Sequence, residues 1–192
     1  MHIDLSRPDA DDPETLMALF NALMEPTLRT RLVRGDEEPL YTPARDAYDV
    51  HRIIFARGYF ASALHEISHW CIAGHARRQL EDYGYWYIPD GRDTNQQAAF
   101  EQAEVKPQAI ESLLAKACGR RFHVSVDNLE SDAEVDRAAF TARVHEQVAQ
   151  YKKVGLPKRA AVVCQAMKAF YKEEGEIDHI TKQWLPFLNK LR

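Results

Sequence analysis

Apolar residues recur every three or four positions over most of the chain, a spacing that predicts amphipathic helices. The clearest example is the stripe formed by Phe60, Leu64, Ile67 and Cys71. Similar patterns predict helices over the ranges 13–26, 94–117, 133–153 and 157–171, with a short one around 180–188. Pro107 lies inside the second of these ranges, where its missing backbone donor predicts a kink or a break between two helices.

Three short segments ahead of the Phe60 stripe read as strands, at 30–34, 39–42 and 52–56. Two further strand-like segments lie at 82–92 and 121–126. A small sheet that runs directly into a helix, followed by mostly helical sequence, predicts an α+β fold. With 192 residues, 45% of them hydrophobic, the chain can bury a core, and we expect one domain over 1–192.

Composition narrows the possible classes of function. The formal net charge of −4 argues against general nucleic-acid binding. No apolar run approaches the length of a membrane span, and the first residues lack the basic and apolar regions of a signal peptide. The three cysteines, Cys71, Cys118 and Cys164, are scattered without a paired metal spacing, which predicts reduced thiols in a cytoplasmic protein.

The predicted helix after the sheet carries the motif His65-Glu66-Ile67-Ser68-His69. Helical spacing of four places His65 and His69 on one face, as two ligands of a metal site. Glu66 lies about 100° around the helix from His65, beside the metal direction. Two histidines on one helix can also form a hydrogen-bonded pair or lie on a solvated face, so a third ligand is needed to support the metal hypothesis.

A third ligand is expected on the helix that contains Pro107. Its polar stripe holds Glu101, Glu104, Gln108 and Glu111 at spacings of three and four. Such carboxylates are most often solvated, but in one broad class of metal enzymes the third ligand follows the His-x-x-x-His helix at this kind of sequence distance. We therefore regard the carboxylates of this stripe as candidates.

Aromatic residues crowd the segment 82–92, where Tyr85, Trp86 and Tyr87 are followed by a Pro-Asp-Gly turn. Rings on both faces of a strand indicate either ordinary packing or the wall of a binding site. Arg77 and Arg78 lie just before this segment, and they either contact an acidic partner surface or are ordinary surface charge.

Three motifs together resemble the elongation factor P hydroxylase family. They are His65-Glu-Ile-Ser-His-Trp-Cys-Ile-Ala-Gly74, Asp82-Tyr-Gly-Tyr-Trp-Tyr-x-Pro-Asp-Gly-Arg92 and Phe100-Glu-x-x-Glu-Val-Lys-Pro-Gln-Ala109. The resemblance covers about 31–150, and the remaining residues match only loosely.

The resemblance implies a cytoplasmic enzyme that uses Fe(II) and dioxygen to hydroxylate the lysylated lysine of elongation factor P. It implies an α+β fold with a small mixed β-sheet, a zincin-like metal-binding helix and a largely helical C-terminal part. His65, His69 and Glu104 occupy the positions of a two-histidine-one-carboxylate iron site. Glu101 is then a partner that orients a ligating histidine, or the alternative third ligand. Elongation factor P is the only macromolecular partner expected, with no nucleic acid or membrane bound directly.

Two other functions remain open on the residues alone. In a zinc peptidase the same helix would hold Zn²⁺, with Glu66 as the catalytic base that takes a proton from metal-bound water. A purely structural metal would need a fourth ligand. In the hydroxylase, a positively charged lysyl extension calls for acidic and aromatic groups near the metal, for which the substrate-binding candidates are Tyr85, Trp86, Tyr87, Asp90 and Glu101.

Overall fold

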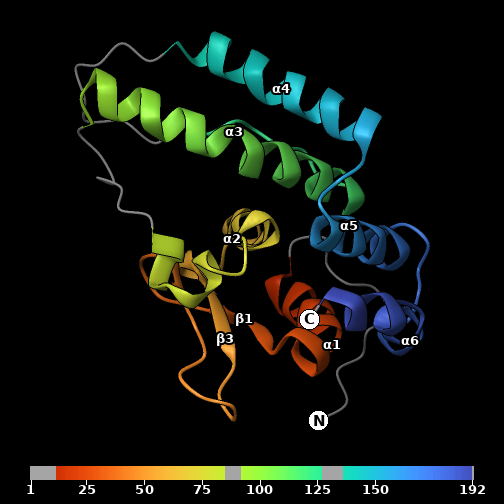
Figure 1. Ribbon diagram of the computed structural model, residues 1–192. Helices are drawn as coiled ribbons and strands as arrows, with labels where there is room; N and C mark the ends of the chain where they lie inside the picture. The colour runs from red at the N-terminus through yellow and green to blue at the C-terminus, as the bar shows by residue number, and fades with distance from the viewer. Residues whose placement is uncertain (1–11, 85–91, 127–135, 192) are drawn as a thin grey trace.

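The computed structural model describes residues 12–84, 92–126 and 136–191 (Figure 1). It confirms the α+β class: these residues contain six α-helices and a small mixed sheet, on which α1 and α2 pack. The elements are α1 (Pro13–Leu28), β1 (Thr30–Arg34), β2 (Leu40–Thr42), β3 (His51–Phe55), α2 (Phe60–Ile72), α3 (Thr94–Ala117), α4 (Arg137–Val154), α5 (Lys158–Tyr171) and α6 (Ile177–Leu188). None of the described helices is both long and apolar enough to span a membrane.

The sheet has the strand order β1-β3-β2, with β1 parallel and β2 antiparallel to the central β3. All three strands lie where the sequence predicted them. β3 leads within a few residues into α2, and the Ser62 hydroxyl accepts a hydrogen bond of 3.0 Å from the Ala56 backbone N–H. The sheet thereby fixes the start of the helix that carries His65 and His69.

A side-chain amide joins α1 to the open edge of the sheet. Asn21 Nδ2 donates to the Leu32 carbonyl at 3.1 Å, and the Leu32 N–H donates to Asn21 Oδ1 at 2.7 Å. Both atoms of Leu32 belong to β1, an edge strand whose outward backbone groups have no neighbouring strand. Asn21 therefore supplies the two hydrogen bonds that a further strand would make.

Replacement of Asn21 with alanine should lower the free energy of unfolding by about 2–4 kcal/mol, because it leaves a partly buried donor and acceptor unpaired. Urea denaturation measures this change. Asn95→Ala is the matched control, since Asn95 is exposed in the first turn of α3 and its loss should change stability by less than about 0.5 kcal/mol. Equal effects of the two variants would contradict the proposed role of Asn21.

The main hydrophobic core lies between α1, the sheet, α2 and α5. The predicted stripe of α2 forms its centre: Phe60, Leu64, Ile67 and Cys71 are each at most 5% exposed. Trp70 packs edge-on against Phe20 of α1, with ring centroids 5.5 Å apart. Because this face of α2 is buried in the core, the opposite face is directed toward α3, which lies above it in Figure 1.

The helix α3 does not break into two helices at Pro107, so that part of the expectation is wrong, and the alternative of a kink stays a prediction. Its backbone stays helical from Thr94 to Ala117, and Pro107 is buried. Packing of α3 against α2, α4 and α5 offsets the one hydrogen bond that the proline removes. Similarly, α1 continues past Pro26 to Leu28 and ends at Arg29, whose backbone is left-handed with φ 49°.

The strand predicted at 121–126 is also absent. This segment runs back along α3, and its backbone is bound by side chains instead of a neighbouring strand. Gln108 Nε2 donates to the Ser125 carbonyl at 2.8 Å, while the Ser125 N–H donates to Gln108 Oε1 at 3.1 Å. Arg92 donates to the Val126 carbonyl at 3.2 Å. These side chains form the hydrogen bonds that a neighbouring strand would otherwise make to the backbone of this segment.

The strand-like segment 82–92 begins differently from our expectation. Residues Glu81–Gly84 form a 3₁₀ turn, with left-handed backbone at Asp82 and Tyr83. The ring of Tyr83 is buried and stacks on Tyr41 of β2 at 4.3 Å between centroids. The substrate-binding candidates Tyr85, Trp86, Tyr87 and Asp90 lie outside the described residues.

Candidate metal centre

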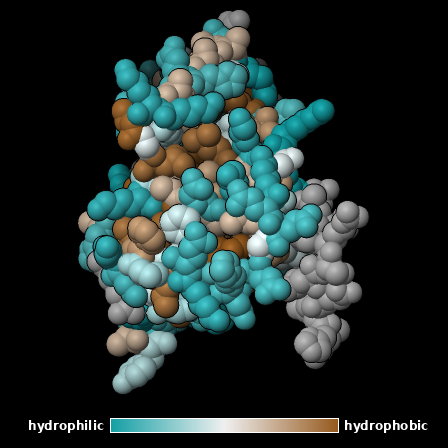
Figure 2. Space-filling view, turned by 90° about the vertical axis from the view of Figure 1, so that its right-hand side faces the viewer, coloured by the Kyte–Doolittle hydropathy of each residue, from teal (hydrophilic) through white to brown (hydrophobic). Residues whose placement is uncertain are grey.

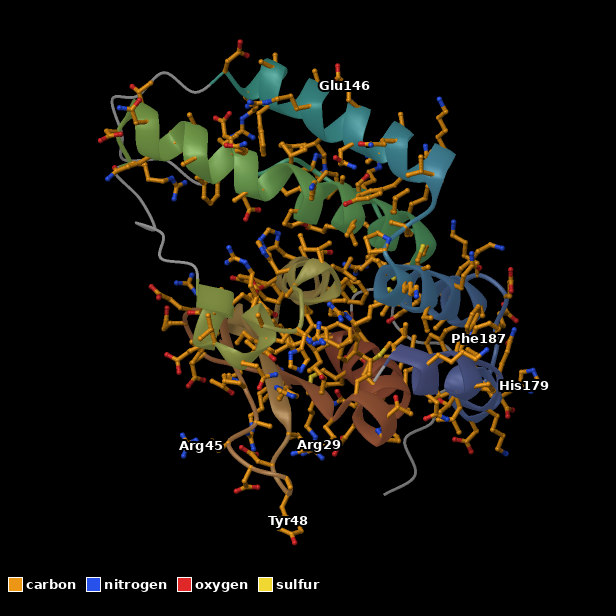
Figure 3. The ribbon with its side chains drawn as sticks, in the orientation of Figure 1. Arg29, Arg45, Tyr48, Glu146, His179 and Phe187 are labelled. Carbon is orange, nitrogen blue, oxygen red and sulfur yellow. The ribbon has the colours of Figure 1, made fainter. Side chains whose placement is uncertain are left out.

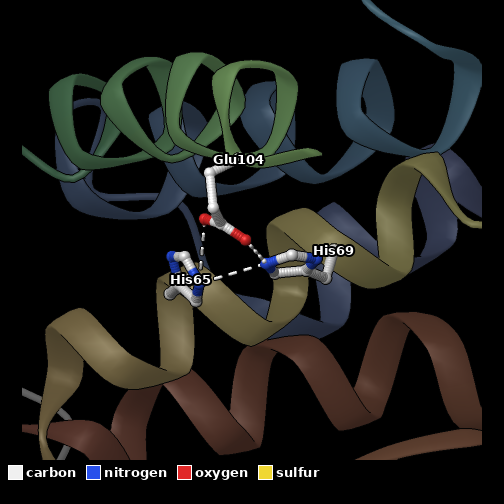
Figure 4. A group of neighbouring side chains, drawn as sticks. All are labelled: His65, His69 and Glu104. Carbon is white, nitrogen blue, oxygen red and sulfur yellow. Dashed lines mark hydrogen bonds and ion pairs between the residues drawn. The ribbon is translucent and has the colours of Figure 1, made fainter. Parts of the chain in front are cut away.

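The structure brings His65 and His69 of α2 together with Glu104 of α3 (Figure 4). The two Nε2 atoms are 3.1 Å apart. Glu104 Oε1 lies 3.0 Å from His69 Nε2, and Glu104 Oε2 lies 3.5 Å from His65 Nε2. The sequence predicted these three residues as one cluster, and among the described residues they form the one group of histidine, cysteine and acidic side chains with the spacing of a metal site.

These separations fit a single bound ion. With metal–ligand bonds of about 2.1 Å, two ligands lie about 3.0 Å apart at a right angle and about 3.4 Å apart at the tetrahedral angle. The observed separations of 3.0 and 3.1 Å fall in this range, and the separation of 3.5 Å lies just above it. Two imidazoles and one carboxylate are a donor set suited to Fe(II) or Zn²⁺.

Glu111 lies two helical turns after Glu104 on α3. It orients His65 as a ligand of the metal. The Glu111 carboxylate lies 2.9 Å from His65 Nδ1 and accepts a hydrogen bond from the Nδ1–H group. A neutral His65 that donates through Nδ1 keeps the lone pair of Nε2 free, and this is the atom that faces His69 and Glu104. A carboxylate that fixes the tautomer of a ligating histidine is typical of metal centres.

The charges of the cluster stabilise one another. Burial by itself would raise the pKa of the Glu104 carboxyl, but the neighbouring His69 and His65 bring that pKa down to about 2. Burial opposes the charged form of His65, yet Glu104 and Glu111 raise the pKa of this imidazole well above its ordinary value. A cation that binds here therefore meets an ionised Glu104 and takes the place of the His65 proton.

Glu66, the carboxylate between the two histidines, lies beside the cluster and outside it. It is half-buried, and among the described residues it makes no hydrogen bond or ion pair. Burial raises the pKa of its carboxyl, opposed by the nearby His65 and His69. Glu66 is thus placed to interact with a molecule bound near the metal.

Glu101 does not make the contact that we expected of it. It was predicted to orient a ligating histidine or to be the alternative third ligand, but its carboxylate pairs with Arg143 of α4 and accepts a hydrogen bond of 3.1 Å from Gln97. Its role in substrate binding stays a prediction. The contact to a histidine is made instead by Glu111, which the sequence placed on the same stripe without a role. Glu111 follows Glu104 by seven residues, which is two helical turns. This spacing places both carboxylates on one face of α3, and it was the feature of the sequence that could have identified Glu111.

Loss of Glu111 should weaken metal binding without abolishing it. We expect Glu111→Ala to raise the dissociation constant of the metal by about 10–100-fold, because His65 loses the group that orients its ring. Competition with a chelating dye measures the affinity. Glu101→Ala is the matched control on the same helix and should stay within about threefold of wild type. A larger loss at Glu101 than at Glu111 would reverse these assignments.

An open cavity of about 1040 Å³ reaches one residue of the metal cluster, His69. Its lining includes His69. The other lining residues come from the end of α2, the loop that follows α2, the middle of α3 and the C-terminal half of α4. Arg77 and Lys106 make part of this lining positively charged. On the face shown in Figure 2, apolar side chains are exposed beneath the topmost helices, within a mostly hydrophilic surface. The cavity therefore offers a mixed polar and apolar surface next to a ligand of the metal.

The arginines near the aromatic segment have mainly structural contacts. Arg77 donates to the Tyr83 carbonyl at 2.9 Å, and Arg78 donates to the Ala73 carbonyl at 2.6 Å, so both hold the loop after α2. Three histidines far from the cluster, His123, His145 and His179, are exposed, and His179 lies on the outside of α6 (Figure 3).

Two comparisons with known proteins agree with this geometry. The family model described as elongation factor P hydroxylase matches residues 19–181. A protein of Haemophilus influenzae named "Elongation factor P lysine hydroxylase" is 50% identical over 165 residues, which are 86% of this chain and 92% of that protein. The matched region contains His65, His69 and Glu104.

Proposed function

Because this chain belongs to the elongation factor P hydroxylase family, we propose that it hydroxylates the lysylated lysine residue of elongation factor P. In this proposal His65, His69 and Glu104 hold Fe(II), and dioxygen is the cosubstrate. The chain is then an oxidoreductase that modifies a translation factor. The name of the Haemophilus influenzae relative supports elongation factor P as the partner and lysine as the target.

The arrangement of the three ligands is the observation that carries the proposal. Their donor atoms lie within 4.8 Å of one another and come from only two helices. Three protein ligands on one side of an ion leave other positions open, and Fe(II) held in this way activates dioxygen for insertion of oxygen into a C–H bond. A closed structural site would instead use a fourth protein ligand, and the described residues include no fourth member in the cluster.

The protein's own residues would bring the target carbon to the metal. The cavity that includes His69 has room for a long side chain with its lysyl extension. Glu104 is ionised, and Glu66 lies beside it with no hydrogen-bond partner in the described part of the chain. Both carboxyl groups favour a positively charged extension over a neutral one. In this role Glu66 is a substrate-positioning group, which differs from its role in a zinc peptidase.

Intact-mass analysis tests the reaction directly. Lysylated elongation factor P should gain the mass of one oxygen atom after incubation with the iron-loaded protein in air. The second oxygen atom of dioxygen leaves as water and consumes two electrons, so the assay includes a reductant such as ascorbate. Isotopically labelled dioxygen should label the product. Unmodified elongation factor P is the matched control and should gain much less. No added oxygen on the lysylated form would contradict the proposal.

A further inference from the structure

A second cavity, of about 380 Å³, is lined by none of the three metal ligands and is strongly basic. The ends of α1, α2 and α5 contribute to it, together with the start of β3 and the loop after α2. Its lining contains three arginines and two histidines, namely Arg29, Arg78, Arg159, His51 and His75. None of the described lining residues is an aspartate or a glutamate. Such a concentration of positive charge in a concave site is costly unless a negative group is bound.

The three guanidinium groups bond to neutral carbonyls and not to carboxylates. Arg29 donates to the backbone carbonyls of Asp46 and Asp49, and Arg78 donates to that of Ala73. Arg159 donates to the carbonyls of Trp70, at 3.0 Å, and of Ala73. In the described part of the chain none of the three forms an ion pair, and the nearby Asp49 side chain is already paired with Arg52 at 2.7 Å. Their positive charges are therefore uncompensated.

Two buried donors at this cavity also lack acceptors. Within the described ranges, the indole Nε1 of Trp70, a residue only 1% exposed, has no hydrogen-bond partner, and neither has Arg159 Nε. The Arg159 guanidinium lies over the Trp70 ring, 4.9 Å from its centroid. In addition, His51 Nδ1 accepts a hydrogen bond from the Ala44 N–H, so its neutral form carries the proton on Nε2 and adds another donor. Buried donors without acceptors are uncommon in folded proteins, and here two of them belong to residues that line one basic cavity.

We infer that this cavity binds a small molecule through an oxyanion group, a phosphate or a carboxylate. The paired N–H donors of an arginine guanidinium match the oxygen atoms of both a phosphate and a carboxylate. The cavity volume suits a small molecule and not a polymer. The inference does not depend on the hydroxylase proposal, because none of the lining residues belongs to the metal cluster.

Capping of α2 explains only part of this arrangement. Arg78 and Arg159 both donate to the Ala73 carbonyl at the C-terminal end of α2, where positive charge is favourable. Burial lowers the pKa of both guanidinium groups, and that of Arg159 is lowered further by Arg78, so the second arginine works against the first. Arg29 and His51 make none of their hydrogen bonds to α2. An oxyanion accounts for all of these groups together.

Isothermal titration calorimetry of the full-length, iron-loaded protein tests the site. Inorganic phosphate and succinate are titrated separately against a chloride blank of equal ionic strength. Saturable binding of phosphate, of succinate or of both supports the inference and identifies the oxyanion group. Arg78→Gln keeps a polar side chain but removes the charge, and it should weaken binding at least tenfold. His75→Gln, at an exposed lining position that is expected to tolerate the change, should weaken it about threefold.

Two controls separate this site from other sources of binding. Arg121→Gln removes an exposed charge outside the cavity and should leave the affinity within twofold of wild type. His65→Ala removes a metal ligand, and phosphate binding should persist in this variant. The inference is overturned if neither anion binds beyond chloride, if Arg78→Gln and His75→Gln behave like Arg121→Gln, or if binding disappears in His65→Ala, since the anion would then be at the metal.

Discussion

Replacement of His69 with alanine is expected to remove bound iron and hydroxylation together, while the protein stays folded. His69 Nε2 lies within 3.1 Å of both other ligands, so its loss leaves one imidazole and one carboxylate, which hold a divalent ion weakly. We expect the metal affinity to fall by more than about 100-fold. This loss is larger than the decrease in affinity that follows when a residue that only orients a ligand is replaced. His65→Ala and Glu104→Ala should behave in the same way, because each contributes one of the three donors.

The fold should survive these changes because the ligands lie outside the buried stripe of α2. His65 and His69 are partly exposed, with side-chain exposures of 28% and 12%, whereas the core residues of the same helix are almost fully buried. Metal analysis after gel filtration and far-ultraviolet circular dichroism measure the two properties separately. His179→Ala is the matched control, at an exposed position on α6 (Figure 3). Full metal retention in the His69 or His65 variant would rule out the site.

The parts of the fold that the sequence predicted well are those set by local pattern. The stripe from Phe60 to Cys71 needed only helical periodicity to identify the buried side of α2, and the spacing of His65 and His69 then fixed their common direction. The three strands were likewise evident from short β-branched runs and turns. In each case the residues that determine the structure are neighbours along the chain.

Contacts between distant segments could not be predicted in the same way. Whether 121–126 forms a strand depends on Gln108, which is bonded to Ser125 across seventeen positions. The choice of Glu111 over Glu101 as partner of His65 depends on how α3 rotates against α2 and on the competing attraction of Arg143 for Glu101. The basic cavity combines residues from Arg29 to Arg159, none of which shares a motif with another. Such features follow from packing, which residue spacing alone does not define.

The role of Glu66 separates the hydroxylase from a zinc peptidase. In a peptidase this carboxylate would take a proton from metal-bound water, and Glu66→Gln would cost about 10²–10⁴ in rate with the metal retained. In the hydroxylase the inserted oxygen comes from dioxygen, so no water has to be activated as a nucleophile. We therefore expect Glu66→Gln to bind iron nearly normally and to keep measurable hydroxylation, since Glu66 makes no hydrogen bond or ion pair with the ligands in the described structure.

Steady-state kinetics on lysylated elongation factor P, together with a peptidase assay of the zinc-loaded protein, distinguish the two functions. If Glu66 positions the positively charged extension, Glu66→Gln should raise KM more than it lowers kcat, because the amide keeps the shape and loses the charge. Glu146→Gln on the exposed side of α4 is the matched control for loss of one negative charge (Figure 3). Should the zinc form of the wild-type protein cleave a peptide, and Glu66→Gln abolish that cleavage, Glu66 would be a general base and the family resemblance would be one of fold and not of reaction.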